Sequence, residues 1–175
     1  MMRPVGYSVL VGLMCAIAAA IPSAAAGAVE APDQASRATY TSLTSTQFES
    51  RLLARTNKRR DARGCRALKP HAALILAARR HTARMVDQRT VSHRLAGEAS
   101  LGTRVRRAGY TNWRIVAENL AAGQSGPAAV FRAWVRSAGH RANLDNCRLR
   151  HVGFAVTIRT GTPWVTADFG RRSRT

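Results

Sequence analysis

The sequence predicts an α+β fold, because its periodic segments change character along the chain. From residue 46 to residue 144 apolar residues recur mostly at steps of three and four, which is the period of an amphipathic helix. After Cys147 the period changes to two, which is typical of strands. Helices first and strands last argue against repeated βαβ units. The length of 175 residues suits one such domain with terminal extensions.

The first helix is expected from residue 46 to about residue 60. Thr46 and Glu49 have the spacing of a capping box, with Thr46 as the N-cap residue and Glu49 at the third helical position. Gly64 is a natural stop behind the helix. One helical face carries the residues that we expect to be buried, which are Phe48, Leu52, Leu53 and Thr56.

Two more helices are expected before residue 110. One should begin near Pro70, since proline suits the first helical position. Its buried side is marked by residues at three- and four-residue steps, which are Leu74, Ala78, His81 and Met85. The other is shorter, covers residues 100–108 and stops at Gly109.

The middle of the chain should hold one strand and two helical pieces. Residues 115–121 have the composition of a strand. A further helix starts at Gly126-Pro127, and a break at Gly139 leads to a short helical piece through Leu144. The residues expected inside are Val130, Phe131, Trp134 and Val135.

The C-terminal part should be a β-hairpin. Alternation with polar or small residues predicts a half-buried strand that carries Val152, Phe154, Val156 and Ile158. A turn over residues 160–163 precedes a second strand over residues 164–169. The domain is therefore predicted to span residues 46–170, with a short basic tail over residues 171–175.

Residues 1–26 have the pattern of a secretory signal peptide. Arg3 is the only charged residue among the first 29, and an apolar run over residues 5–21 is followed by small residues. An A-x-A site places cleavage after Ala26, with cleavage after Ala28 as the alternative. The competing interpretation is an uncleaved anchor helix, against which the small-residue end argues.

Cleavage would produce a secreted or extracellular chain. Residues 27–45 are rich in Ala, Ser and Thr and are expected to be a flexible lead-in. Loss of Arg3 would reduce the formal charge from +19 to +18. We expect the processed chain to be a monomer without a transmembrane anchor.

The cysteine residues predict one disulfide bond. Cys15 would leave with the signal peptide, so Cys65 and Cys147 would remain. An even pair in an oxidising compartment favours a disulfide, with two buried free thiols as the alternative. The bond would close a loop of about eighty residues and contribute about 4 kcal/mol in the chain-entropy model. A C-x-x-C motif does not occur, which argues against thiol–redox chemistry and zinc ribbons.

The charge of +19 and the isoelectric point near 11.8 favour anionic partners. Seven basic residues between Arg55 and Lys69 form the densest cluster. A second cluster contains Arg104, Arg106 and Arg107. Aromatic residues make up only 6%, which argues against base stacking and hence against nucleic acid. The favoured interpretation is a solvated basic surface without a dedicated partner, and an anionic envelope polymer or lipid is the alternative as a partner.

Two of the five histidines stand out together with one acid. His93 and His140 lie in loop-like segments among small residues, while Glu118 lies in an apolar, strand-like run. A carboxylate there costs several kcal/mol unless it is paired or ligated. Two imidazoles and one carboxylate could hold a zinc ion with an open position, or could act in general acid–base catalysis.

Each of these residues also has a structural interpretation. His93 could be an ordinary surface histidine, and Glu118 could be paired with one of the many arginines. His81 lies on the apolar face of a helix and is expected to pack in the core. His71 and His151 have no evident role in the sequence.

Several ordered segments together resemble the CAP superfamily, in the secreted bacterial form of its SCP-like extracellular domain. The matching segments are Asn57–Arg60 with Gly64-Cys65, Ala77-Ala78 with His81 and Met85, Val91-Ser92-His93, Arg104, Ala108-Gly109-Tyr110, Ala117–Ala121, Ala133–Asn143, Val152-Gly153-Phe154 and Trp164–Gly170. The resemblance extends over about residues 47–170.

The resemblance implies an α-β-α sandwich, with a small antiparallel sheet between helical layers. It also implies a cleft lined by two histidines and two acids, which binds a divalent metal in some members. His93, Glu118 and His140 match three of these four positions. Ser137 stands where many eukaryotic members have the second acid. Cysteines at the positions of Cys65 and Cys147 agree with some actinobacterial-type members.

The expected function is therefore binding at the cell envelope or outside the cell. The His-Glu-His cleft would hold a divalent metal or a small or lipid ligand. The alternatives are a metal-assisted hydrolase of peptides or wall components, and a charge-driven binder of anionic envelope polymers. The sequence contains no phosphate loop, G-x-S-x-G or H-E-x-x-H motif, so a site must be assembled from distant segments. No strong base–nucleophile pair is evident, which favours binding over catalysis.

Overall fold

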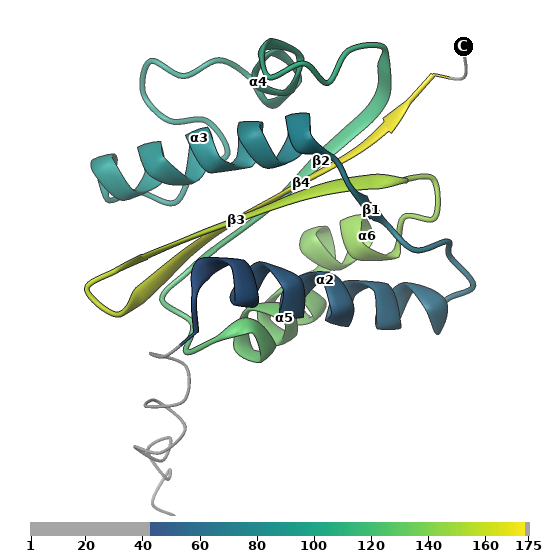
Figure 1. Cartoon of the computed structure of the whole chain (residues 1–175), viewed down its shortest axis with the longest axis horizontal. Coiled ribbons are helices and arrows are strands. Elements are labelled where there is room, and N and C mark those ends of the chain that lie inside the picture. Colours follow the sequence, from purple (N-terminus) through teal and green to yellow (C-terminus); the bar gives the residue numbers. More distant parts are fainter. Residues whose placement is uncertain (1–42, 174–175) are drawn as a thin grey trace, which may run out of the picture. The chain divides into compact units, whose positions relative to one another are not determined.

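The structure is a computed structural model that describes residues 43–173. These residues form a three-layer sandwich with a sheet between two layers of helices, as predicted (Figure 1). The predicted signal peptide and nearly all of the predicted lead-in lie outside the described residues. Within residues 43–173 no helix is long and apolar enough to cross a membrane.

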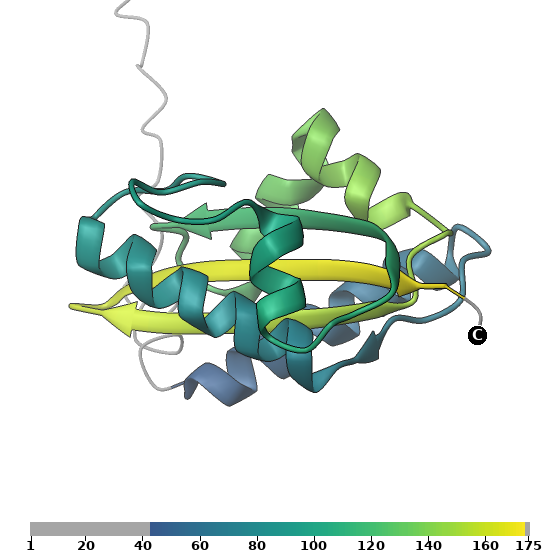
Figure 2. The same cartoon turned by 90° about the horizontal axis from the view of Figure 1, so that it is seen from above.

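The two helical layers are unequal. One face of the sheet is covered by α3 (Ala72–Gln88) and α4 (Leu101–Arg107), which lie over the strands in Figure 2. The other face is covered by α2 (Ser45–Asp61), α5 (Pro127–Arg136) and α6 (Ala138–Asp145). Helices thus cover both faces of one sheet, which agrees with the predicted α-β-α sandwich.

The sheet has four strands in the order β1-β3-β4-β2. Three long strands are antiparallel, namely β2 (Trp113–Ala122), β3 (His151–Arg159) and β4 (Thr162–Arg172). The two-residue strand β1 (Lys69–Pro70) runs parallel to β3 at the edge. The sheet is thus mixed. Strand β1 was not predicted, because two residues are too few to show a periodic pattern in the sequence.

The β3–β4 hairpin has a two-residue turn, Thr160-Gly161, with φ of 45° and 74°. Positive φ at both central residues is the geometry that matches the twist of paired strands. The prediction that β3 is half-buried was wrong, because five consecutive residues, Val152–Val156, are buried. Helices cover both faces of this strand, so small residues between the large ones are buried as well.

The predicted capping box was placed two residues too late. Thr44 is the N-cap of α2, its hydroxyl accepts from the Gln47 N–H, and Gln47 bonds back to the Thr44 N–H. Glu49 instead accepts from the Val156 N–H at 3.1 Å, on the open edge of β3. The S/T-x-x-E/Q pattern of a capping box occurs twice here, at residues 44–47 and at residues 46–49. In the second pattern the Glu49 side chain is used by the contact with β3.

Helix α3 begins at Ala72, close to the predicted start near Pro70, but the prediction that Pro70 is its first helical residue was wrong. Pro70 belongs to β1 and pairs with Val152, while His71 is the N-cap residue. The His71 Nδ1 atom accepts from the Ala73 N–H at 3.2 Å, so this histidine has a structural role that the sequence did not reveal. The buried side of the helix is as predicted, with Leu74, Ala78, His81 and Met85 fully buried.

The largest core lies between the sheet and the layer of α2, α5 and α6. It contains Phe48, Leu52, Trp134, Leu149, Phe154 and Phe169. The predicted disulfide bond between Cys65 and Cys147 is confirmed, with Cα atoms 4.8 Å apart. Beside it the buried Arg60 donates to the carbonyls of Arg66, Leu144, Asn146 and Leu149. Arg60 therefore does not belong to the basic surface that the sequence predicted.

Candidate functional site

The three predicted site residues come from three different elements. Glu118 lies on β2, His93 lies in the loop after α3, and His140 lies in the first turn of α6. The structure brings Glu118 and His93 into direct contact. The His140 ring lies beside the His93 ring, with centroids 6.5 Å apart.

Glu118 holds both His93 and Arg104. Its Oε1 atom lies 2.8 Å from His93 Nδ1, and its Oε2 atom accepts from Arg104 Nη2 at 2.7 Å. Arg104 Nη2 also donates to the backbone carbonyl of His93 at 3.2 Å. One buried arginine therefore fixes the carboxylate and the histidine loop at the same time. The alternative prediction, that Glu118 is paired with an arginine, is confirmed. Arg104 is buried and therefore does not belong to a basic surface cluster with Arg106 and Arg107.

The pKa of Glu118 reflects this pairing. Burial by itself would raise the pKa of this carboxyl group, but the His93 hydrogen bond and the charges of Arg104 and His81 together outweigh it. The pKa of Glu118 thus lies below its usual value, and the group is ionised. As an anion it favours the form of His93 in which Nδ1 carries a proton.

The two site histidines differ in their electrostatic surroundings. The hydrogen bond to Glu118 raises the pKa of His93 above its usual value. Burial and then the neighbouring His93 charge lower the pKa of His140. His93 has 62% of its side chain exposed, whereas the His140 residue is half-buried. The site therefore places an imidazole that is more easily protonated next to one that is less easily protonated.

Two asparagines fasten α6 to β2 under the histidine pair. Asn119 Nδ2 donates to the His140 carbonyl at 3.1 Å. Asn143 Nδ2 donates to Asn119 Oδ1 at 2.8 Å and to the Glu118 carbonyl at 3.2 Å. These bonds fix the distance between the element that carries Glu118 and the element that carries His140.

A second carboxyl group, Asp168, lies beneath the site and was missed in the sequence. It is directly opposite Glu118 in the β2–β4 register and is fully buried. Among the described residues no donor group reaches either of its side-chain oxygens, and the Glu118 carboxylate is their hydrogen-bonding neighbour. Burial and then the Glu118 charge hold the pKa of Asp168 well above its usual value, which favours the neutral form of this acid. An acid within the apolar run from Val165 to Phe169 was the available signal.

The buried His81 extends the network to Glu98. Its Nδ1 atom lies 2.9 Å from Glu98 Oε2, and its Nε2 atom lies 3.7 Å from Glu118 Oε2. His81 packs in the core, as predicted. It also connects two acids, which its position on an apolar helical face did not indicate.

The predicted metal ligands do not form a three-ligand centre in this arrangement. Both Glu118 oxygens are used by His93 and Arg104. Among the described residues, no group of three or more His, Cys, Asp or Glu side chains is arranged to hold a metal ion. Catalytic zinc sites use three protein ligands and structural sites use four. The two imidazoles alone fall short of that set, and zinc binding stays a prediction.

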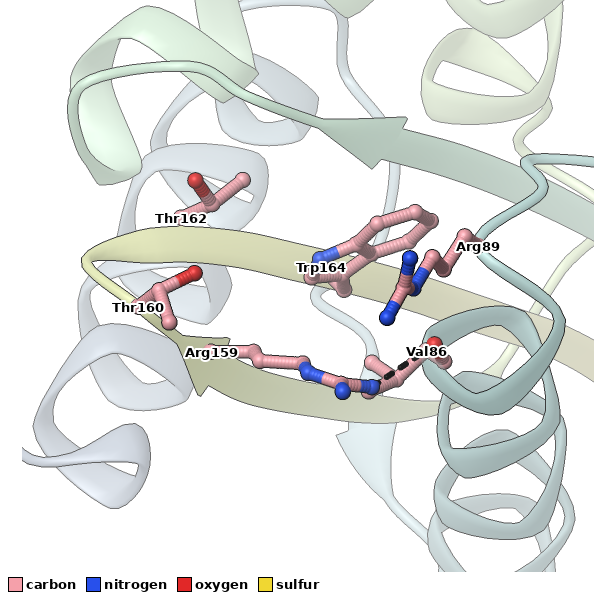
Figure 3. A pocket seen from close by; sticks show the side chains of 6 residues that line it. All are labelled: Val86, Arg89, Arg159, Thr160, Thr162 and Trp164. Atoms are coloured by element: carbon pink, nitrogen blue, oxygen red, sulfur yellow. Dashed lines mark hydrogen bonds between the residues drawn. The ribbon is translucent and has the colours of Figure 1, made fainter.

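A separate hollow lies at the tip of the β3–β4 hairpin. It has a volume of about 310 Å³ and is lined by Val86, Arg89, Arg159, Thr160, Thr162 and Trp164. In Figure 3 Arg159 reaches from β3 to α3, where it donates to the Val86 carbonyl at 3.2 Å. These six lining residues include neither site histidine and no acid, so this hollow is distinct from the histidine pair.

Comparison with known proteins finds bacterial proteins that are similar to this chain in sequence and in fold. The chain is 27% identical over 124 residues to the uncharacterized protein YkwD of Bacillus subtilis (strain 168). The aligned region covers 71% of this chain and 48% of the relative. A solved extracellular protein with an SCP domain from Bacillus anthracis str. Ames is 26% identical, with a TM-score of 0.67 over 73% of this chain and 41% of that one. This chain therefore spans about half the length of these relatives.

A second solved structure shares the fold at lower identity. It is an outer surface protein of Borrelia burgdorferi that is 20% identical, with a TM-score of 0.70 over 75% of this chain and 97% of that one. The sequence model of the family described as "CAP: Cysteine-rich secretory protein family" matches residues 53–169. That match includes every residue of the site described above, and the chain belongs to the CAP family of cysteine-rich secretory proteins.

Proposed function

We propose that this chain is an extracellular CAP-domain binding module whose ligand contacts the His93–His140 pair. One observation carries the proposal: His93 exposes most of its imidazole while a buried carboxylate holds the other side of the ring. Binding sites work best when the contacting group is exposed and its supporting contacts are rigid. Arg104, Asn119 and Asn143 supply that rigidity.

The same contacts favour binding over catalysis. The pKa of Glu118 lies below its usual value, so this carboxylate is a weak base near neutral pH. Ser92, the hydroxyl next to His93 in sequence, donates to the Arg94 carbonyl at 2.9 Å and accepts from the Arg94 N–H. Its hydrogen bonds are thus made within its own loop and not with an imidazole.

The expected ligand is a small molecule or lipid with an acidic group. The raised pKa of His93 favours the imidazolium, and an imidazolium donates charge-assisted hydrogen bonds to carboxylate or phosphate oxygens. The neutral His140 next to it adds a donor or an acceptor at the same place.

Three observations support an extracellular role. The N-terminal sequence has the pattern of a signal peptide. The Cys65–Cys147 disulfide is typical of proteins that fold in oxidising compartments. The Bacillus anthracis protein with an SCP domain is described as extracellular.

Histidine NMR with acetate as the probe tests the ligand class. Below pH 6.5, where His93 is protonated, acetate should move the ring signals of His93 and His140 along a saturable curve. The His93→Ala variant should lose the response at His140, and a His71→Asn variant, which keeps a capping side chain, should not. Equal shifts with chloride at matched ionic strength would contradict an acidic ligand at this pair.

The hydrolase alternative is tested separately. The secreted protein and its His93→Ala variant are compared on peptide and cell-wall substrates, with and without added Zn²⁺. We expect no turnover that depends on His93. Hydrolysis that is lost in His93→Ala and retained in His71→Asn would replace binding with catalysis as the function of the site.

A further inference from the structure

A second, strongly basic cavity lies where β1 runs beside β3 and β4 ends. Its volume is about 550 Å³, and its lining includes six basic side chains, from Arg66, Lys69, Arg150, His151, Arg171 and Arg172. No aspartate or glutamate is among the described residues that line it. We refer to these six residues and the cavity as the C-terminal basic pocket.

The fold assembles this pocket from three distant segments. Lys69 on β1 pairs with His151 on β3, and His151 pairs with Gly170 on β4. The Lys69 N–H donates to the Arg150 carbonyl at 2.9 Å, and the Arg150 N–H donates to the Gly170 carbonyl at 3.0 Å. The disulfide at Cys65 and Cys147 lies just before two of these segments. The backbone that carries the cations is therefore fixed before any ligand arrives.

Burial, together with the basic side chains of the pocket, lowers the pKa values of two neighbouring histidines, His151 and His71. The pKa of His151 is lowered by burial and then by His71, Arg172 and Lys69. The pKa of His71 is lowered by burial and then by Arg172. Among the described residues, Arg66, Lys69, Arg171 and Arg172 form no ion pair, while Asp145 pairs with Arg59 and Glu118 with Arg104.

Concentrated like charge opposes folding unless an anion offsets it. Guanidinium groups present a planar fork that matches phosphate oxygens in pairs. A hollow lined by several such forks can surround a phosphate group, which a flat basic surface cannot do. We propose that the C-terminal basic pocket binds a phosphate group of a phosphodiester polymer at the cell envelope.

The surroundings of the pocket favour a polymer over a lipid surface. Among the described residues, the exposed large hydrophobic side chains are Leu76 and Val91, and neither lines the pocket. A membrane-binding site usually combines basic residues with apolar side chains that enter the bilayer. A water-exposed polymer with repeated phosphates requires only the basic residues, and neighbouring phosphates can follow the charge beyond the cavity.

The test compares two triple variants of equal charge and composition. The pocket variant carries Arg66→Gln, Lys69→Gln and Arg171→Gln. The control variant carries Arg51→Gln, Arg55→Gln and Lys58→Gln on the exposed face of α2. The full chain is titrated with poly(glycerol phosphate) over a salt series, with polygalacturonate as the carboxylate polymer. Circular dichroism and the Tm confirm that both variants are folded.

The pocket variant should bind poly(glycerol phosphate) about tenfold or more weakly than the wild type, since up to three charge-assisted contacts are lost. Its log K should also fall less steeply with log salt, because fewer counterions are released. The control should remain within about threefold of the wild type. Equal loss in both variants would show binding by net charge alone and overturn the proposal, as would equal affinity for polygalacturonate. Tighter binding to phosphatidylglycerol vesicles than to the polymer would overturn the choice of partner.

Inorganic phosphate provides a second, site-resolved readout. A phosphate held in the pocket stabilises the protonated form of His151, so its NMR titration midpoint should rise on addition of phosphate. The rise should be absent in the pocket variant and present in the control. An unchanged His151 midpoint in the wild type would contradict a phosphate site at this place.

Discussion

Arg104 contacts both parts of the candidate site, since its Nη2 atom donates to Glu118 Oε2 and to the His93 carbonyl. In the sequence it is one of three arginines within four residues and has the pattern of a surface cluster. Its burial follows from the place where α4 packs beside β2. The neighbours Arg106 and Arg107 are both exposed, although Arg107 lines the same pocket as Arg104. Counting charges in the sequence does not distinguish a buried arginine such as Arg104 from exposed ones.

Replacing Arg104 with Met should lower the free energy of unfolding by about 3 kcal/mol, because the buried Glu118 charge would lose its guanidinium partner. Urea unfolding measures this loss. Adding Glu118→Gln should recover part of it, so the double variant should be more stable than the sum of the single losses predicts. Strict additivity would show that the two side chains are not coupled.

Asp168 should make the folded state less stable as pH rises. Its pKa is raised in the folded protein, so above about 3.8 the unfolded chain ionises this group while the folded chain keeps the proton. Its contribution is therefore fully present below that pH and is lost as pH rises towards the folded pKa. The Asp168→Asn variant should gain stability relative to the wild type along this range, as followed by thermal unfolding at several pH values. A constant difference would contradict a neutral Asp168.

The residues of the site differ in how far the sequence reveals them. Glu118 is conspicuous because an acid in an apolar run needs a partner, and Asp168 carries the same signal in β4. Their interaction depends on the β2–β4 register, which the sequence does not display. The choice of Arg104 from many arginines likewise depends on the packing of α4. Residue types could be predicted, whereas partners could not.

At the scale of the elements, α3 and β3 approach each other closely at Gly153. A Cβ atom at Gly153 would lie 2.1 Å from the Leu74 carbonyl carbon and 2.2 Å from the Ile75 nitrogen. These are backbone atoms of α3, so neither a rotamer change nor a small shift relieves the overlap. The absence of a side chain at Gly153 therefore sets the distance between helix and sheet.

Gly153→Ala should destabilise the domain by about 3 kcal/mol, because α3 must move away from the sheet. Gly139→Ala is the matched control, since a Cβ there meets nothing within 4 Å and the residue lies in α6. This control should be neutral or stabilising by about 0.5 kcal/mol. Thermal unfolding of both variants provides the comparison, and equal Tm values would contradict the close approach.

The helices and the two strands of the C-terminal hairpin could be predicted because their apolar residues recur periodically, whereas β2 was predicted from its composition. Their ends were less certain, since two capping patterns overlap at residues 44–49 and Pro70 suits either a helix start or an edge strand. The short strand β1 forms only because β3 offers it a partner. Contacts between elements, and not local preference, decide these cases.

At the scale of the whole molecule, the disulfide and Arg60 join the start and the end of the helical segments. Cys65 and Cys147 are 82 residues apart in sequence, and Arg60 donates to carbonyls on both sides of the bond. The double variant Cys65→Ala with Cys147→Ala should lose about 4 kcal/mol of unfolding free energy, mainly because its unfolded chain is less restricted. Urea unfolding measures the difference. A loss below about 1 kcal/mol would mean that Arg60 and the core alone hold this region together.

The two proposed sites lie at different places in the molecule. The histidine pair lies beside β2 and α6, and the basic pocket lies where β4 ends. The high net charge of the chain is consistent with an anionic envelope, and the pocket gives part of that charge a defined place. The histidine pair carries the more specific chemistry. It depends on His93 being held by Glu118 beside a neutral His140.

The most direct measurement is therefore an NMR pH titration of all histidine rings in the wild type and in Glu118→Gln. The titration midpoint of His93 should lie above 6.5 and that of His140 below it. Removing the carboxylate should lower the His93 midpoint and leave His71 unchanged. The stabilisation by protonated His93 would be present at acidic pH and lost as pH rises through its folded pKa. Equal midpoints for His93 and His140, or no response of His93 to Glu118→Gln, would contradict the site described here.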